Sequence, residues 1–294
     1  MKPIIKWVGG KTQLLDVLET KIDLENRDYS NMTYVEPFVG AGALFLDLAE
    51  KDIFNKYIIN DINPRLINVY NTIKNDVDGL IIELKTLKDS YLSMNEDDRK
   101  TMYYNKRTRF NNIEIESYNI ESAALFIFLN KTCFNGLYRE NKNGEFNTPY
   151  NRSKSPSFFV ESELRKLNNI LNTKNVQIFN NSYSELEPII INDNCFVYLD
   201  PPYRPITKGG FNGYNKSGFN DNDQIILRDF CDRLNDNQQM FMLSNSDPHM
   251  LDPDDNFFDD LYSNYTIDRV QASRKVNSDK NNRGCINEIL VYNF

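Results

Sequence analysis

The strongest constraint on the fold is a strand–turn–helix pattern near the N-terminus of this 294-residue chain. The run Thr33–Glu36 is rich in strand-forming residues and is closed by Pro37. The glycine turn Gly40–Gly42 follows, and apolar residues then recur at helical spacing from Leu44 to Leu48. A strand that passes through a tight glycine turn into a helix is the first half of a β-α-β unit. The pattern therefore predicts a parallel sheet covered by helices.

Further strand signals alternate with helical stretches along the chain. They lie at Tyr57–Ile59, Val176–Phe179, Cys195–Leu199, Gln239–Leu243, Tyr265–Val270 and Glu288–Tyr292. The run Cys195–Leu199 is apolar throughout, as expected of a parallel strand that is buried on both faces. Gln224–Leu234 has helical periodicity, and the last two strands are expected to pair antiparallel. We therefore expect an α/β fold with a doubly wound, mostly parallel sheet and a terminal antiparallel pair.

The middle of the chain differs from both ends, because it has helical periodicity and few strand signals. Apolar residues predict three helices in it, at Leu66–Ile73, Leu80–Leu87 and Ala123–Leu129. This contrast predicts a sheet domain made of residues 1–63 and 157–294, into which a mainly helical domain of residues 64–156 is inserted. Residues 209–223 are rich in Asn and Asp and are expected to form a long loop.

Composition limits the classes of function. Four scattered cysteines and a single histidine, His249, argue against a disulfide framework, a multi-histidine metal site and Ser-His-Asp catalysis. No apolar run reaches the roughly 18 to 20 residues of a transmembrane helix, and no secretory signal is visible, so we expect a cytoplasmic protein without a membrane partner. The formal charge is −8, yet segments 131–154 and 269–294 each carry five basic residues against two acidic ones. Net charge therefore does not exclude a basic surface for nucleic acid.

The glycine turn is the first candidate site. A bare backbone at a helix N-terminus lets a ligand approach closely. Asp61 ends the next strand, 21 residues after Gly40, a spacing that suits a carboxylate binding ribose hydroxyls. The FxGxG pattern does not meet the GxGxxG fingerprint, which makes an NAD-dependent dehydrogenase a poor alternative. A tight connection without any ligand would need the same glycines.

The second candidate site is the motif Asp200-Pro201-Pro202-Tyr203, directly after the buried apolar strand. Ligands of open α/β sheets bind at the carboxyl ends of the strands. The two prolines fix the backbone and remove two N–H donors, so their carbonyls and the Asp200 carboxylate form an array of acceptors. Tyr203 adds a flat aromatic face. An amino group on a planar ring fits this array; a rigid strand-end turn with a surface aspartate is the alternative without a function.

Five motifs in their order along the chain resemble those of the Dam-type DNA adenine-N6 methyltransferases, which use S-adenosylmethionine. They are Lys6–Lys11, Glu36–Gly42, Asn60–Asn63, Phe134–Arg139 with Gly144–Tyr150, and Asp200–Tyr203. The resemblance covers essentially the whole chain and has the alpha-group order, in which the cofactor loop precedes the recognition region and the Asp-Pro-Pro-Tyr motif. It implies a Rossmann-like class I methyltransferase sheet, with residues 64–156 as the target-recognition domain.

The resemblance also implies which residues bind the cofactor. They are Trp7, Lys11, Phe38, Gly40, Gly42, Asp61, Ser182, Tyr183 and Asp200. Lys11 would pair with the carboxylate of S-adenosylmethionine, Asp61 would hold its ribose, and Tyr183 would lie near its adenine. The product would be S-adenosylhomocysteine, and no metal is expected.

A second set of residues would bind double-stranded DNA. It comprises Lys6, Phe134, Asn135, Leu137, Arg139, Asn141, Asn147, Arg152 and Lys154. The family reads GATC with this stretch, and Lys6 and Arg139 match positions that read guanine, which an arginine can bind through O6 and N7. Phe134 lies where an aromatic side chain can wedge beside the extruded adenine. Ser153 departs from the pattern, because some members carry an aromatic residue there that touches a base.

The implied reaction is an attack of adenine N6 on the methyl group of the cofactor, with Asp200, Pro201 and Tyr203 as the catalytic residues. Asp200 and the Pro201 carbonyl would accept hydrogen bonds from the amino group and stabilise the positive charge that builds on N6. The adenine must leave the duplex to be reached, and Tyr203 would stack on the flipped ring.

Other functions remain open on the sequence alone. Methyltransferases of cytosine N4, RNA or protein glutamine agree less well with Asp200 and with the stretch 134–154. A binding protein that keeps the fold without catalysis agrees less well with an intact Asp200 and Tyr203. We expect a monomer that acts on DNA. Two roles stay open on the sequence: an enzyme that stands alone, and a partner of a cognate restriction endonuclease in a restriction–modification system, without direct contact between the two.

Overall fold

The computed structural model describes residues 1–114, 118–152, 154, 156–205, 218–273 and 285–294. A seven-stranded sheet forms the centre of this part of the chain, in the order β3-β2-β1-β4-β5-β7-β6. Its strands are β1 Thr33–Glu36, β2 Lys56–Asn60, β3 Val176–Phe179, β4 Cys195–Leu199, β5 Met240–Ser246, β6 Thr266–Ser273 and β7 Cys285–Tyr292. Strands β1 to β5 pair in parallel, whereas β7 pairs antiparallel with both β5 and β6. The expected mostly parallel sheet with a terminal antiparallel pair is confirmed.

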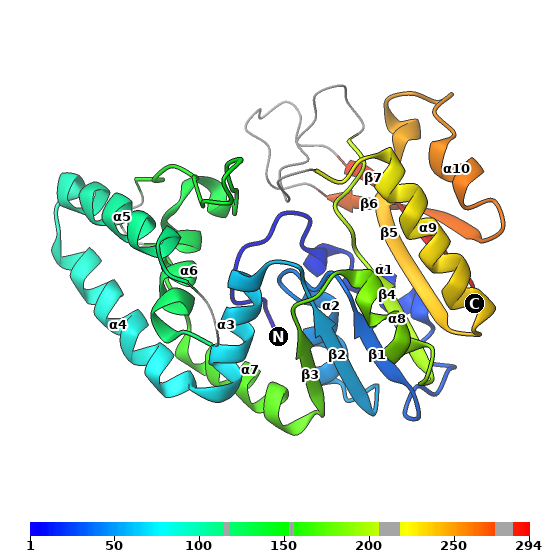
Figure 1. The fold of residues 1–294 in the computed structure, drawn as a ribbon, viewed down its shortest axis with the longest axis horizontal. Helices are drawn as coiled ribbons and strands as arrows, with labels where there is room; N and C mark the ends of the chain where they lie inside the picture. The colour runs from blue at the N-terminus through cyan, green and yellow to red at the C-terminus, as the bar shows by residue number, and fades with distance from the viewer. Residues whose placement is uncertain (115–117, 153, 155, 206–217, 274–284) are drawn as a thin grey trace.

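Helices cover both faces of the sheet (Figure 1). They are α1 Leu15–Ile22, α2 Ala43–Glu50, α3 Pro64–Asn75, α4 Val77–Ser93, α5 Glu96–Asn111, α6 Ile120–Thr132, α7 Glu161–Thr173, α8 Glu187–Ile190, α9 Asp221–Asp236 and α10 Phe257–Leu261, with the 3₁₀ turns η1 Lys11–Gln13, η2 Phe134–Gly136, η3 Tyr183–Leu186 and η4 Pro248–Met250. Successive strand residues face opposite sides of a sheet. Tyr34 and Phe196 therefore belong to one core, and Val35 and Val197 to the other. Burial on both faces explains why β4 reads as an unbroken apolar run.

The region of residues 64–156 is mainly helical, as predicted, and lies beside the sheet (Figure 1). Helix α6 is its centre, because it packs against α3, α4 and α5 and its residues 122–130 are all buried. Helix α3 also packs against α7, and Lys74 Nζ donates a hydrogen bond to the Val176 carbonyl at 2.6 Å. Helix α3 therefore ties the helical region to the edge of the sheet.

Helix α5 is not predicted by the sequence pattern. Only Met102, Tyr103 and Phe110 of this helix are buried, and its first turn is capped by the side chain of Asn95. Such a sparse apolar stripe gives little helical periodicity among so many charged residues. The helix owes its place to packing against α6, which is a tertiary contact.

The predicted loop at residues 209–223 needs a correction at its end. Asn220 caps the first turn of α9, and residues 221–223 are helical. Asn and Asp are favoured at helix caps as well as in loops, so their richness here marks a helix N-terminus. Residues 209–217 of the predicted loop lie outside the described residues.

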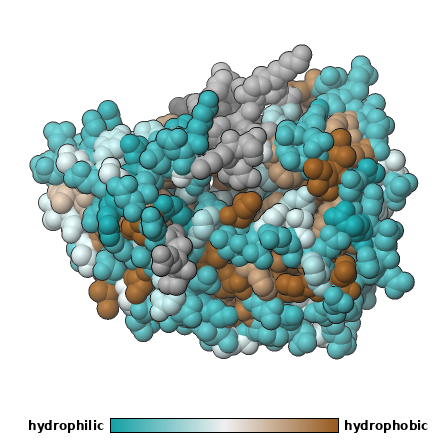
Figure 2. All heavy atoms as spheres, viewed as in Figure 1, coloured by the Kyte–Doolittle hydropathy of each residue, from teal (hydrophilic) through white to brown (hydrophobic). Residues whose placement is uncertain are grey.

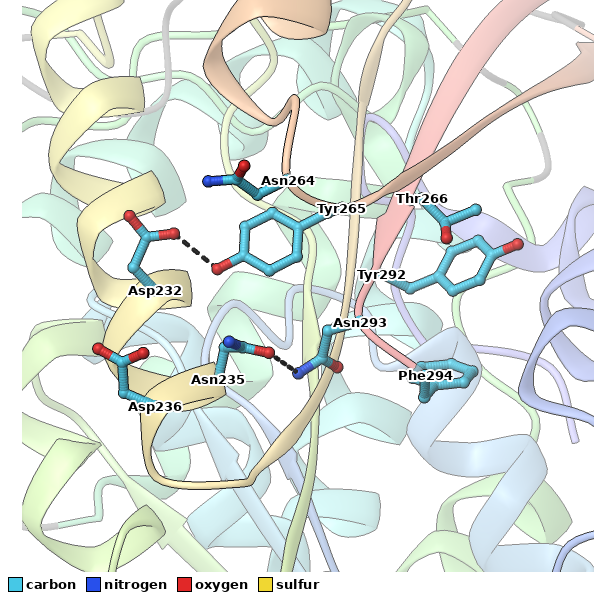
Figure 3. A pocket seen from close by; sticks show the side chains of 9 residues that line it. All are labelled: Asp232, Asn235, Asp236, Asn264, Tyr265, Thr266, Tyr292, Asn293 and Phe294. Atoms are coloured by element: carbon cyan, nitrogen blue, oxygen red, sulfur yellow. Dashed lines mark hydrogen bonds between the residues drawn. The ribbon is translucent and has the colours of Figure 1, made fainter.

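A hollow of about 640 Å³ lies at the sheet end where β5 begins (Figure 3). It is lined by Asp232, Asn235, Asp236, Asn264, Tyr265, Thr266, Tyr292, Asn293 and Phe294. The Tyr265 hydroxyl donates to Asp232 at 2.6 Å, and the Asn293 amide donates to Asn235 at 3.1 Å. Ligands of such sheets bind at the opposite end, where the parallel strands finish. The hollow is therefore separate from the candidate site.

Candidate active site

The glycine turn and Asp61 meet at the carboxyl ends of the neighbouring strands β1 and β2, as predicted. The Gly40 N–H donates to Asp61 Oδ2 at 3.1 Å, and the Asn63 N–H donates to Oδ1 at 2.9 Å. Burial raises the pKa of Asp61 to about 6, and the two N–H donors oppose that rise. Gly40 and Gly42 have φ angles of +49° and +67°, which glycine adopts without strain. The turn thus presents bare backbone beside a carboxylate.

Trp7 lies directly on this turn. A Cβ atom added to Gly40 would stand 2.7 Å from Cδ1 of the indole, so no side chain fits between them. The indole also stacks on Tyr138 of the recognition stretch, with 5.6 Å between the ring centroids. The N-terminal segment therefore lies between the glycine turn and the inserted helical region, a contact that no local sequence signal predicts.

An aromatic pair borders the turn. The rings of Phe38 and Tyr183 lie 5.2 Å apart between centroids. Asn60, at the end of β2, joins the two segments, because its Nδ2 donates to one backbone carbonyl in each, at 2.9 and 3.0 Å. Ser182 caps the turn η3, which begins at Tyr183. The cofactor residues predicted on these two segments therefore lie together beside the glycine turn.

Asp200 follows β4 and lies in a cluster with Lys11, Tyr203 and Glu288. Lys11 Nζ is 2.8 Å from Asp200 Oδ1 and 4.0 Å from Glu288 Oε2, and its side chain is only 4% exposed. The amine also lies 4.7 Å from the centroid of the Tyr203 ring, and the Tyr203 hydroxyl donates to Glu288 Oε2 at 2.6 Å. Lys11, predicted to meet the cofactor carboxylate, pairs here with the predicted catalytic acid. Glu288 is missed by the sequence analysis, because it belongs to none of the motifs.

Burial and charge set the protonation of this cluster. Burial raises the pKa of Asp200 to about 6, and Lys11 opposes the rise. Burial lowers the pKa of Lys11, but the carboxylates of Asp200 and Glu288 outweigh it and leave a net upward shift. Glu36 is 3% exposed, and burial raises its pKa to about 8, although a hydrogen bond from the Tyr34 hydroxyl opposes this. At pH 7 the Asp200 carboxylate is therefore mostly ionised and Glu36 mostly protonated.

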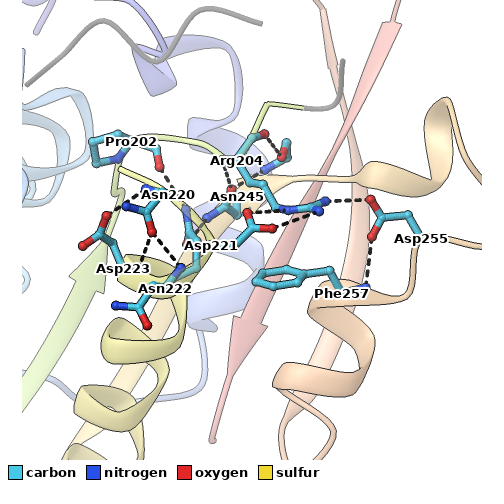
Figure 4. Close-up of polar contacts among 11 residues, drawn as sticks. Pro202, Arg204, Asn220, Asp221, Asn222, Asp223, Asn245, Asp255 and Phe257 are labelled. Carbon is cyan, nitrogen blue, oxygen red and sulfur yellow. Dashed lines mark hydrogen bonds and ion pairs between the residues drawn. The ribbon is translucent and has the colours of Figure 1, made fainter. Parts of the chain in front are cut away.

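The segment after Asp200 is held by side chains from α9 and from the approach to α10 (Figure 4). The Arg204 guanidinium donates to Asp221 at 2.9 Å and to Asp255 at 2.7 Å. The backbone N–H of Arg204 donates to Asn245 Oδ1 at 3.1 Å. These bonds fix the turn that carries the two prolines. They join residues far apart in the sequence, which is why no motif marks them.

The N-terminal segment also reaches the predicted recognition stretch. Asn130 of α6 is 2% exposed; it accepts the Lys6 N–H at 2.8 Å and donates to the carbonyls of Lys6 and Gly136 at 2.9 and 3.1 Å. The Lys6 side chain packs on Gly136, where an added Cβ would stand 2.4 Å from Lys6 Cδ. Lys6 is thereby brought to the segment that ends in Arg139, the other residue predicted to read guanine.

Residues 133–150, which hold most of the predicted recognition stretch 134–154, form an irregular hairpin joined by two isolated bridges. Arg139 Nε donates to Asn147 Oδ1 at 2.7 Å, so a residue predicted to contact the DNA backbone orients the predicted base reader. Phe134 is 49% exposed, an unusual state for a large apolar ring. The hairpin therefore presents an oriented arginine and an open aromatic side chain.

Lys131 is the first residue of the basic segment 131–154, but no motif of the sequence marks it as a DNA contact. Burial lowers its pKa to about 8, and the nearby Lys6 amine acts in the same direction. Within the described residues, neither amine forms an ion pair with a carboxylate. Two neighbouring cations without a carboxylate favour an anionic partner.

The other predicted DNA contacts lie on the hairpin or just after it. They are Asn135, Leu137, Asn141, Arg152 and Lys154. Asn135, Arg152 and Lys154 are exposed. Asn141 is engaged within the hairpin, where it donates to Glu145 Oε2 at 2.7 Å. Ser153, the departure from the family pattern, lies outside the described residues.

Hydrophilic side chains cover most of the face seen in Figure 2, and hydrophobic ones gather near its middle.

Over the described ranges, no helix is long and apolar enough to cross a membrane. In the same part of the chain, no three His, Cys, Asp or Glu side chains are grouped so that they could hold a metal ion.

Over residues 7–276 the sequence matches the family described as D12 class N6 adenine-specific DNA methyltransferase. It is 43% identical to the type II methyltransferase M.MjaIII of Methanocaldococcus jannaschii, over 100% of this chain and 99% of that protein. It is 32% identical to the type II methyltransferase M1.LlaDCHI of Lactococcus lactis subsp. cremoris, over 100% and 96% of the two chains. It is 31% identical to the DNA adenine methylase of Haemophilus influenzae, over 99% and 93%.

Proposed function

Because the chain belongs to the D12 class N6 adenine-specific DNA methyltransferase family, we propose that it methylates N6 of a flipped-out adenine in GATC sites of double-stranded DNA. The observation that carries this proposal is the path of one short segment. Lys6 packs on the recognition hairpin, Trp7 lies on the glycine turn, and Lys11 pairs with Asp200. The six residues Lys6–Lys11 thus contact the hairpin, the glycine turn and Asp200. A DNA methyltransferase needs its base-reading, cofactor-binding and catalytic residues to lie together in this way.

The residues around the glycine turn fit S-adenosylmethionine. Gly40 leaves bare backbone, Asp61 offers a carboxylate to ribose hydroxyls, and the Phe38–Tyr183 pair offers a flat apolar surface to adenine. The Asp200 carboxylate suits a positively charged sulfur. When bound, this cofactor supplies an electrophilic methyl group and leaves as S-adenosylhomocysteine.

Asp200 acts on the adenine amino group, whose lone pair is delocalised into the ring. The ionised Asp200 carboxylate and the Pro201 carbonyl accept hydrogen bonds from N6, which frees the lone pair and stabilises the charge that builds on N6. Within the described residues no hydrogen bond reaches the Pro201 carbonyl, whereas that of Pro202 accepts one from Gln224 at 3.2 Å. As the new N–C bond forms the methyl–sulfur bond breaks, and one N6 proton then leaves to water.

An adenine inside a duplex must be flipped out before Asp200 can reach it, at a cost of a few kcal/mol. Lys11 lies over one face of the Tyr203 ring and Glu288 holds its hydroxyl, so the ring is a fixed surface on which the flipped base can stack. Phe134, half exposed on the recognition hairpin, wedges beside the base that has left the stack.

We assign sequence reading to a target-recognition domain of residues 64–156, inserted into a catalytic domain of residues 1–63 and 157–294. Arg139 binds guanine O6 and N7. Its Nε donates to Asn147, and the two terminal amino groups of the guanidinium supply the donors for the base. Arg152 and Lys154 contact phosphates, which sets the register of the DNA without selecting a sequence.

A role in restriction–modification is supported by two relatives that are named type II methyltransferases. In such a system the enzyme would protect host DNA in the cytoplasm from an endonuclease that cuts the same site. We propose that it does so as a monomer without touching that endonuclease.

Plasmid digestion tests the proposal. Plasmid DNA is isolated from cells that express the wild type or Asp200→Ala and is cut with two nucleases that both recognise GATC. One of the two is blocked by N6-methyladenine and the other is not. Protection from the blocked nuclease by the wild type alone is the expected result. Cleavage by both nucleases, with N6-methyladenine found elsewhere in the plasmid, would reject GATC as the site.

A further inference from the structure

Glu288 is an acid whose one part in the proposed reaction so far is to hold the Tyr203 hydroxyl. It lies on β7, where its backbone is opposite Ser246 of β5 and Val270 of β6. Its side chain is 15% exposed, accepts the Tyr203 hydroxyl at 2.6 Å and lies 4.0 Å from Lys11 Nζ. Burying a carboxylate costs free energy unless its partners compensate for the lost water. The two partners of Glu288 therefore indicate its role.

Both partners of Glu288 also compete for Asp200. Lys11 Nζ is 2.8 Å from Asp200 Oδ1. Burial raises the pKa of Asp200, and Lys11 and the Tyr203 hydroxyl both oppose that rise. A carboxylate has a limited number of lone pairs, and each donor that Asp200 accepts takes one from the adenine amino group. Glu288 is the second acceptor that can draw these donors away.

We propose that Glu288 is a positioning residue for methyl transfer, which accepts the Tyr203 hydroxyl and shares the Lys11 amine so that one side of the Asp200 carboxylate stays open to the adenine amino group. The inference rests on the proposed function, because it explains how that same site is held. It also accounts for the fixed Tyr203 ring, whose hydroxyl is anchored and whose face is covered by Lys11. Glu288 needs no contact with the substrate in either role.

The charge of Glu288 makes its effect on Asp200 measurable. The titratable groups that face it from the described elements are Lys11 of η1, Tyr198 of β4, and Asp200 and Tyr203 after β4; Glu36 of β1 also acts on Lys11. The residues opposite it on β5 and β6 are uncharged. Its negative charge raises the pKa of Asp200, so removal of the charge lowers that pKa. The acid limb of the kcat–pH profile then moves to lower pH.

Two variants separate the charge of Glu288 from its hydrogen bond. Glu288→Gln removes the charge but keeps an oxygen that can accept the Tyr203 hydroxyl, whereas Glu288→Ala removes both. Asp268→Asn is the matched control, because Asp268 lies on the neighbouring strand β6 and also pairs with a tyrosine and a lysine, Tyr292 at 2.7 Å and Lys21 at 2.5 Å. The readouts are kcat against pH with saturating cofactor and GATC duplex, and a carboxyl-¹³C aspartate NMR titration of the free protein, assigned with Asp200→Asn.

In both Glu288 variants we expect the acid limb of kcat and the Asp200 resonance to titrate at lower pH than in the wild type. Glu288→Ala should also lose about 10- to 100-fold in kcat, since a misplacement of about 1 Å can cost about 100-fold. That loss should shrink in a Tyr203→Phe background, where the hydroxyl that Glu288 holds is already gone. Asp268→Asn should match the wild type. An unmoved acid limb and Asp200 resonance, or a full loss in the Tyr203→Phe background, would overturn the inference.

Failure of the proposed function would look different. The wild type itself would then transfer no methyl group to DNA, and the proposed function would fall. The NMR titration would still decide the inference on the free protein, because an Asp200 resonance that titrates alike in wild type and Glu288→Gln would overturn it.

Discussion

Lys11→Met should destabilise the protein by an amount that depends steeply on pH. The Lys11 side chain is 4% exposed, and its amine faces Asp200 at 2.8 Å and Glu288 at 4.0 Å, with Glu36 also near. Methionine keeps a long unbranched side chain but removes the charge. The variant therefore leaves these carboxyl groups without their buried cation.

The size of this effect follows from the protonation of Asp200. Removing one partner of a buried ion pair costs about 3 to 5 kcal/mol of folding stability. Because Asp200 is 20% exposed, we expect a cost at the lower end of this range. Burial raises the pKa of Asp200 to about 6 with Lys11 present, and loss of Lys11 raises it further. A carboxyl group whose folded-state pKa exceeds its unfolded value stabilises the fold at low pH, and this stability is lost as the pH rises through the folded-state pKa. We expect a cost of about 3 kcal/mol at pH 8.5 and roughly 1 kcal/mol at pH 5, where Asp200 is protonated.

Urea denaturation at these two pH values measures the effect, with fluorescence of Trp7, the one tryptophan in the sequence, as the probe. Lys21→Met is the matched control, because Lys21 pairs with Asp268 at 2.5 Å but is 35% exposed. The control should cost less than about 1 kcal/mol at both pH values. An equal cost of Lys11→Met at pH 5 and pH 8.5, or a cost no larger than that of the control, would refute the reasoning.

The kcat of methyl transfer should fall below about pH 6, because a protonated Asp200 is a poor acceptor; a flat profile from pH 5 to pH 8 would contradict this. Gly40→Ala should lower stability by about 1 to 2 kcal/mol and weaken binding of S-adenosylmethionine, because φ is +49° and the added Cβ meets an indole at 2.7 Å. Denaturation and calorimetry measure these two effects. Glu36→Gln should gain stability relative to the wild type between pH 7 and pH 9, because burial raises the pKa of Glu36 to about 8 and its stabilisation is lost as the pH rises through that value; parallel denaturation midpoints over this range would argue against it. Arg139→Ala should lose about 1 to 3 kcal/mol of discrimination at one base pair of GATC, whereas Lys154→Ala should weaken binding to all sequences alike. Methylation of every single-base variant of the site distinguishes the two.

The sheet and the pairing of the glycine turn with Asp61 could be predicted because their signals are local. Each strand contains a short run of strand-forming residues, and burial of β4 on both faces leaves an unbroken apolar run. The turn and Asp61 end neighbouring parallel strands, so the topology alone brings them to one edge, where the Gly40 N–H bonds the carboxylate.

The contacts that assemble the site could not be predicted, because they join residues distant in sequence. Glu288 meets Tyr203 across 85 positions, and Asn130 meets Lys6 across 124. Neither residue stands out locally: Glu288 lies within a terminal strand, and Asn130 lies within a buried helix. Helix α5 was missed for a related reason, since packing against α6 stabilises it and its own pattern is too polar to predict it.

The most direct test is nucleoside analysis of DNA methylated in vitro. A duplex that contains one GATC site is incubated with the protein and with S-adenosylmethionine labelled in its methyl group, then hydrolysed and analysed by mass spectrometry. We expect label in N6-methyldeoxyadenosine with the wild type and none with Asp200→Ala. Label in N4-methyldeoxycytidine, or equal label in a duplex that lacks GATC, would contradict the assignment of this chain as a GATC adenine-N6 methyltransferase.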